Sequence, residues 1–97
     1  MPTTLVYDVP PSYRTNGYIF IKVRDRHLFP PPGTAVELLL GESNEPADGQ
    51  VRMETNNRLR MYGLRRWFAS LGERRSLTVE ITPVESMKTY RIRPVSM

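Results

Sequence analysis

Short segments in which apolar and polar residues alternate recur along the chain, and this period of two predicts β-strands. Residues 77–81 alternate most clearly, with Leu77, Val79 and Ile81 on one face and Thr78 and Glu80 on the other. We expect the apolar face of this strand to lie in the core. The other predicted strands are residues 5–7, 18–23, 35–40 and 90–93. Residues 18–23 would carry one shared apolar face of Ile19, Ile21 and Val23.

The middle of the chain predicts a β-hairpin. Its turn would be Thr55-Asn56-Asn57, because asparagine tolerates the positive φ that tight hairpin turns require. Alternation then divides the two arms into an apolar face and a polar face. The apolar face would carry Val51, Met53, Leu59 and Met61, and the polar face would carry Arg52, Glu54, Arg58 and Arg60.

Two further segments have helical features. Residues 64–71 hold an apolar stripe at helical spacing, and Gly72 is well placed to end the helix. The stripe is Leu64, Trp67, Phe68 and Leu71, and the solvated side is Arg65, Arg66 and Ser70. We therefore expect Trp67 and Phe68 in the core, and not free to stack on unpaired bases. A shorter helical turn is predicted around residues 24–28, and its His27 would be structural or solvated. The prolines at residues 30–32 would then form a rigid connection.

The length of the chain indicates a single domain that spans residues 1–97. Its many short predicted strands and two short helices predict a mainly β (α+β) fold, a barrel or partly open barrel. The absence of cysteine excludes disulfides and thiolate metal sites, and one histidine leaves little material for a metal site. We see neither a signal peptide nor an apolar run that could span a membrane. We expect no cofactor, no metal and an intracellular location, in the cytoplasm and associated with a nucleoid or nucleus.

Charge is concentrated in one segment. Residues 50–75 hold seven of the twelve arginines against two glutamates, a local balance of +5, whereas residues 1–49 have a balance of −2. A concentrated field of one sign attracts a polyanion. Only two of the fourteen basic residues are lysine, and the planar fork of arginine binds phosphate oxygens or a guanine edge in pairs. The charge pattern therefore predicts a nucleic-acid binder.

Several blocks of sequence together resemble a known family. They are residues 12–21 (SYRTNGYIFI), Leu28-Phe29-Pro30, the hairpin at residues 50–62, Leu64-Arg65-Arg66-Trp67-Phe68, and residues 77–81 and 89–94. Over residues 5–94 the chain resembles the DNA-binding pseudobarrel superfamily, which includes the plant "B-three" transcription-factor domain. It is most similar to the effector or recognition domains of restriction endonucleases. The resemblance implies a seven-stranded open pseudobarrel that grips duplex DNA in the major groove with two arms.

The resemblance also implies which residues would contact the DNA. The first arm would be the loop at residues 11–16, and the second would be the hairpin at residues 52–60. The candidate DNA-binding residues are Tyr13, Arg14, Asn16, Arg52, Asn56, Asn57, Arg58 and Arg60. Arginine can pair with guanine and asparagine with adenine in the major groove. The acidic stretch at residues 41–49 would point away from the phosphates.

The sequence leaves three alternatives to duplex recognition. An enzyme is disfavoured, because the sequence holds no Gly-rich phosphate loop, nucleophile elbow or His–Cys constellation. An RNA- or single-strand-binding β-barrel would instead need exposed aromatic residues on a strand face, such as Tyr18, Phe20 and Tyr62. A protein-interaction subunit that docks on a nuclease partner is the third alternative. The oligomeric state stays open at this stage.

Overall fold

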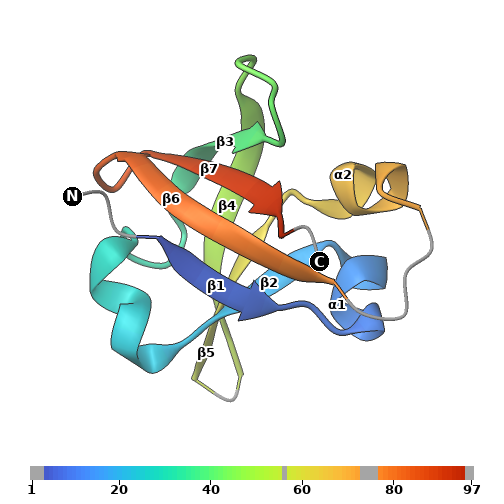
Figure 1. The fold of residues 1–97 in the computed structure, drawn as a ribbon. Helices are drawn as coiled ribbons and strands as arrows, with labels where there is room; N and C mark the ends of the chain where they lie inside the picture. Colours follow the sequence, from blue (N-terminus) through green and yellow to red (C-terminus); the bar gives the residue numbers. More distant parts are fainter. Residues whose placement is uncertain (1–3, 56, 73–76, 96–97) are drawn as a thin grey trace.

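The computed structural model describes residues 4–55, 57–72 and 77–95, and within them seven strands form one curled, open sheet (Figure 1). The strands are β1 (Leu5–Asp8), β2 (Tyr18–Ile21), β3 (Ala35–Leu40), β4 (Ala47–Glu54), β5 (Arg58–Tyr62), β6 (Thr78–Glu85) and β7 (Thr89–Pro94). The helices are α1 (Pro11–Asn16), α2 (Arg65–Ser70) and a 3₁₀ helix, η1 (Val23–Leu28). The mainly β, open pseudobarrel expected from the sequence is confirmed.

The strand order is β1-β6-β7-β3-β4-β5-β2. Neighbouring strands are antiparallel except β3 and β7, which pair in parallel. The sheet therefore has its two edges at β1 and β2, which follow one another in the sequence. The connection between these edges contains α1 (Figure 1).

One face of the curled sheet forms the core. Leu77, Val79 and Ile81 are buried, as their alternation predicted. Phe29 stacks on Tyr90, with ring centroids 4.9 Å apart. The other fully enclosed core side chains include Ile19, Ile21, Leu38, Val51, Met61 and Ile92. With Leu5 and Tyr7 of β1 and Val79 and Ile81 of β6, buried residues come from all seven strands, so the core ties the whole sheet together.

Three expected strand features differ in the structure. The strand predicted at residues 18–23 ends at Ile21, and Val23 is 70% exposed in η1. The last pair of β2 is Ile21 with Leu59, one position from the start of β5, so that strand offers a partner for at most one further residue. β4 begins at Ala47, so the end of the acidic stretch is strand and not loop. Met53 is 40% exposed, although its cross-strand partner Leu59 is buried.

The α2 helix confirms most of its predicted stripe. Leu64 and Phe68 are buried, while Arg65, Arg66 and Ser70 are exposed. Trp67 and Leu71 are only half-buried and pack against the edge of the core. His27, on η1, is exposed. The chain leaves α2 through Gly72, whose φ of 77° is the left-handed conformation that glycine adopts at helix ends.

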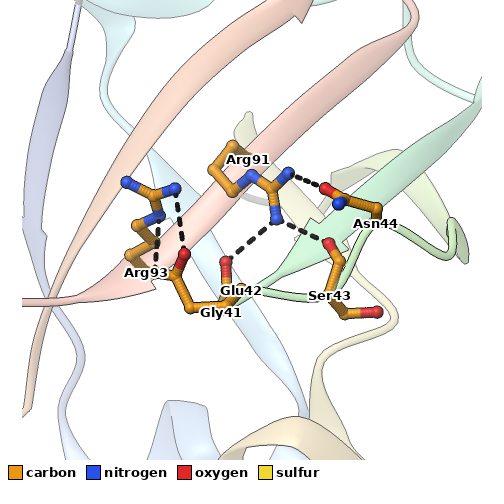
Figure 2. Close-up of polar contacts among 6 residues, drawn as sticks. All are labelled: Gly41, Glu42, Ser43, Asn44, Arg91 and Arg93. Carbon is orange, nitrogen blue, oxygen red and sulfur yellow. Dashed lines mark hydrogen bonds and ion pairs between the residues drawn. The ribbon is translucent and has the colours of Figure 1, made fainter.

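Two arginines of β7 hold the loop at residues 41–46, which carries Glu42 and Glu45 and which we call the acidic loop (Figure 2). Arg91 donates hydrogen bonds to the carbonyl oxygens of Gly41 and Ser43 and to the side-chain oxygen of Asn44. The Arg93 Nε atom lies 3.2 Å from a Glu42 carboxylate oxygen. The acidic loop leads into β4 at the end opposite the β4–β5 turn (Figure 1). These two arginines are therefore occupied away from the hairpin.

Buried tyrosine hydroxyls predict that the folded protein loses stability in alkali. Burial raises the pKa of Tyr90 from 10.0 to about 12, and the Tyr90 hydroxyl donates to the Leu28 carbonyl. Because the unfolded chain releases this proton at lower pH, the stabilisation is complete below pH 10 and declines as the pH rises from 10 towards 12. Burial, and then the hydrogen bond to Asp25, also raises the pKa of Tyr7, which adds to the same loss.

The Tyr90→Phe variant measures the Tyr90 share of this loss. We expect its free energy of unfolding to fall less steeply above pH 10, by up to about 1.4 kcal/mol per pH unit. Urea unfolding at intervals from pH 7 to pH 11.5 gives both curves. Between pH 7 and pH 9 the curves should run parallel, offset by the lost hydrogen bond. Equal slopes above pH 10 would show that Tyr90 does not retain its proton.

Candidate nucleic-acid interface

The face of β2, β4 and β5 that points away from the core carries aromatic and basic side chains. Alternation puts Ile19, Ile21, Leu59 and Met61 into the core, so the residues between them lie on the outer face. The register brings Tyr18 opposite Tyr62, and Arg60 between Phe20 and Arg52. We call this surface the arginine–tyrosine face; it consists of Tyr18, Phe20, Arg52, Glu54, Arg58, Arg60 and Tyr62.

Each of the three arginines on this face lies over an aromatic ring. The Arg60 guanidinium carbon is 4.2 Å from the centroid of Tyr18. The corresponding distances are 5.3 Å from Arg52 to Tyr62 and 5.7 Å from Arg58 to Phe20. A guanidinium over a ring is attracted by the electrons of the ring face, which holds these long side chains close to the sheet.

A hydrogen-bonded group lies among these arginines. The Tyr62 hydroxyl donates to a Glu54 carboxylate oxygen at 2.5 Å and accepts a longer bond of 3.4 Å from Arg60. The bond with Tyr62 is the main cause that raises the pKa of Arg60. Desolvation, followed by the bond to Glu54, raises the pKa of Tyr62. Tyr62 therefore stays a neutral donor, and Glu54 offsets part of the positive charge of the face.

The first arm is a helix, which corrects the loop expected at residues 11–16. Helix α1 begins with Pro11 at a position where proline is well tolerated, because its missing N–H would have no helical partner there. The helix ends at Gly17, whose φ is 77°. An apolar stripe could not predict it, because none of its residues is buried.

Helix α1 meets the arginine–tyrosine face through Tyr13. The ring of Tyr13 is 4.8 Å from that of Tyr18, and Tyr18 is in turn 5.4 Å from Tyr62. Arg14 is half-buried, and its Nε atom has no hydrogen-bond partner among the described residues. Asn16 is exposed, and its amide donates to the Ser12 carbonyl. Tyr13 is thus part of the packing and Arg14 is partly enclosed, whereas Asn16 lies on the outer surface of the arm.

The second arm is the predicted hairpin. Asn57 has a φ of 57°, the conformation expected of an asparagine in this turn. Its amide donates to the Glu54 carbonyl at 3.0 Å, which closes the turn. Asn57 and Arg58 are exposed. Asn56, the remaining candidate at the tip, lies outside the described residues.

The structure brings four of the candidate residues together. Arg52, Arg58 and Arg60 share the arginine–tyrosine face, and Tyr13 joins α1 to its Tyr18–Tyr62 end. The ring partners of the arginines were foreseen only in the single-strand alternative. Sequence reasoning also missed Arg26, whose side chain donates to the Asn57 carbonyl at the tip. Nothing in the local sequence connects these two positions, which are 31 residues apart.

The described residues form neither a metal-binding cluster nor a membrane-spanning helix. Across residues 4–55, 57–72 and 77–95, no cluster of three or more His, Cys, Asp or Glu side chains is placed to bind a metal ion. No helix in the described part of the chain has both the length and the apolar character needed to cross a bilayer.

Comparisons with solved structures identify the fold. The structure is similar to the N-terminal domain of Helicobacter pylori LlaJI.R1, with a TM-score of 0.77 and 14% identity over 100% of this chain and 82% of that one. It is also similar to the hypothetical Arabidopsis thaliana protein At1g16640.1, with a TM-score of 0.62 and 12% identity over 97% of this chain and 92% of that one. No family model and no curated protein matches the sequence. At such identities the property shared is the fold.

Proposed function

We propose that this protein is a sequence-reading, duplex DNA-binding domain that contacts the major groove through two arms, α1 and the β4–β5 hairpin. The observation that carries the proposal is the row of arginines, each held over an aromatic ring on one outer face. Its pseudobarrel fold is the one implied by the resemblance to DNA-binding domains. In this proposal the domain performs no chemistry, and any nuclease activity belongs to a partner protein.

The chemistry of stacked arginines suits this function. Stacking uses the flat face of the guanidinium and leaves its N–H edge available for hydrogen bonds. That edge can donate two parallel bonds to a phosphate or to O6 and N7 of guanine. Because the rings of Tyr18 and Tyr62 already restrict Arg60 and Arg52, less side-chain entropy is lost on binding.

The same packing argues against stacking of single-stranded bases. A stacking platform needs an open ring face. Tyr18 is only 7% exposed and is contacted by Tyr13, Tyr62 and Arg60. The central aromatic residue of the single-strand alternative is therefore covered, and duplex DNA is the better candidate.

The proposal predicts duplex binding that weakens with salt. Contact of Arg52 and Arg60 with phosphates would give a slope of about −2 for the logarithm of the association constant against the logarithm of salt concentration. Fluorescence anisotropy with a labelled random-sequence duplex, from 50 to 300 mM salt, measures this slope. A labelled single strand of the same length, at the same salt concentrations, should bind more weakly.

Selection from a random duplex library tests sequence reading separately. Recovery of a consensus site would support base recognition and would supply the preferred duplex used below. Stronger binding of the single strand would favour the RNA- or single-strand-binding alternative. Absence of binding to either nucleic acid would reject the proposal and favour a protein-docking function.

A further inference from the structure

Arg26 connects the 3₁₀ helix η1 to the tip of the β4–β5 hairpin. Its Nη2 atom donates a hydrogen bond of 2.5 Å to the carbonyl oxygen of Asn57. Its Nε atom is buried, with no hydrogen-bond partner in the described ranges. The base of the guanidinium is therefore enclosed by protein, while its far end holds the turn. Neither the predicted arms nor the arginine–tyrosine face includes this residue.

Helix η1 is itself fixed to the core on both sides of Arg26. On one side, the buried Asp25 carboxylate accepts a 2.6 Å hydrogen bond from the Tyr7 hydroxyl. On the other side, the Leu28 carbonyl accepts a 2.8 Å bond from the Tyr90 hydroxyl. Tyr7 and Tyr90 are both core residues. Arg26 therefore extends from a rigid support.

The hairpin tip has little other support. The last strand pair of the hairpin is Glu54 with Arg58. Beyond this pair, the described contacts of the turn are the Asn57 amide bond to Glu54 and the bond from Arg26. The Asn57 carbonyl that Arg26 holds belongs to the peptide bond leading directly into Arg58. Its orientation therefore affects two candidate base-reading residues of the arm, Asn57 and Arg58.

We propose that Arg26 is a positioning residue, which fixes the hairpin tip so that Asn57 and Arg58 meet the base edges in one orientation. The role of the tip in base reading rests on the proposed function. A fixed tip lowers the ordering cost of each base contact. Phosphate contacts tolerate a mobile tip better, because they depend less on the orientation of the donor. Loss of Arg26 should thus reduce discrimination more than general affinity.

The test compares Arg26→Met with Arg24→Met. Both changes remove one positive charge from η1, but the Arg24 side chain is 74% exposed and makes only a long ion pair of 3.8 Å with Asp25. For each variant, amide hydrogen exchange of the free protein reports on Asn57 and Arg58. The affinity for the preferred duplex divided by the affinity for the random duplex gives the preference ratio. The change of the logarithm of the association constant with the logarithm of salt concentration gives the salt slope.

We expect Arg26→Met to accelerate exchange at the Asn57 amide and to lower the preference ratio about tenfold, the size expected for one charge-assisted hydrogen bond. The salt slope should stay unchanged. Arg24→Met should leave exchange and preference at their wild-type values. Arg26→Lys, which keeps a charge and a donor, should recover part of the preference.

Other results would overturn the assignment. A salt slope reduced by about one, with unchanged exchange at the tip, would make Arg26 a phosphate contact. If Arg26→Met and Arg24→Met change the amide exchange and the preference ratio by the same amount, Arg26 does not position the hairpin tip. If Arg26→Met does not fold, Arg26→Gln takes its place with the same measurements. Should the wild type bind no duplex, the proposed function fails, and the exchange comparison still decides whether Arg26 holds the tip.

Discussion

Gly17→Ala should lower the free energy of unfolding by about 2–5 kcal/mol, the sum of a left-handed backbone penalty and overpacking. Gly17 has a φ of 77°, where a side chain is strained. A Cβ atom there would lie 2.7 Å from the Arg65 Cβ and 2.9 Å from the Arg65 backbone nitrogen. Because the Gly17 carbonyl also accepts the Leu64 amide at 3.1 Å, α1 and α2 cannot separate at low cost.

Gly72→Ala is the matched control for this clash. Gly72 has the same φ of 77°, but a Cβ atom there would meet no atom of the described residues within 4 Å. Its substitution should cost only the backbone penalty, about 1–2 kcal/mol. Thermal or urea unfolding gives the free energy of unfolding of both variants. The difference between their losses is the cost of the contact with Arg65, because the backbone penalty is common to both. If both variants lose the same stability, the approach of α2 to Gly17 is looser than described.

Arg58→Ala should weaken binding to the preferred duplex by about 1–3 kcal/mol, the discrimination provided by one bidentate contact with a base. Arg58 is exposed next to the turn and lies over Phe20, so its N–H edge is free to bind a base. Binding to random duplex should fall much less. Competition titrations with both duplexes, at one salt concentration, give the two losses directly.

The control for Arg58 is Arg66→Ala. Arg66 is exposed on α2 and is not among the candidate DNA-binding residues, and its removal changes the net charge by the same amount. We expect it to affect both duplexes equally and slightly. An equal loss on preferred and random duplex for Arg58→Ala would show that Arg58 contacts phosphate and does not read a base.

The strands were predictable because alternation is a local property of the sequence. Residues 35–40 and the hairpin turn were found from apolar residues, glycine and asparagine alone. Helix α1 was not found, because it has no buried residue and so no helical stripe. Pro11 is its first residue, a position to which proline is well suited, but this single signal did not distinguish a helix from the loop that was expected.

The shared face of three candidate arginines was predictable from the sequence, but their contacts were not. Alternation put Arg52, Arg58 and Arg60 on one face, and the structure agrees. Which rings Arg58 and Arg60 cover depends on the pairing of β2 with β5, whose strand residues lie about forty positions apart in the sequence. The bond from Arg26 to Asn57 depends on tertiary structure in the same way. Such contacts follow from strand register, which a single sequence does not fix.

The order of the strands gives α1 a mechanical role. The sheet opens between β1 and β2, and the short chain that ties these two borders together is the segment with α1 at its centre. It therefore acts as a strap of fixed length across the gap. Inserting a few residues into it would let the borders move apart while every strand kept its neighbour. In the proposed function this strap carries the first arm, so its length would determine where that arm stands against the duplex.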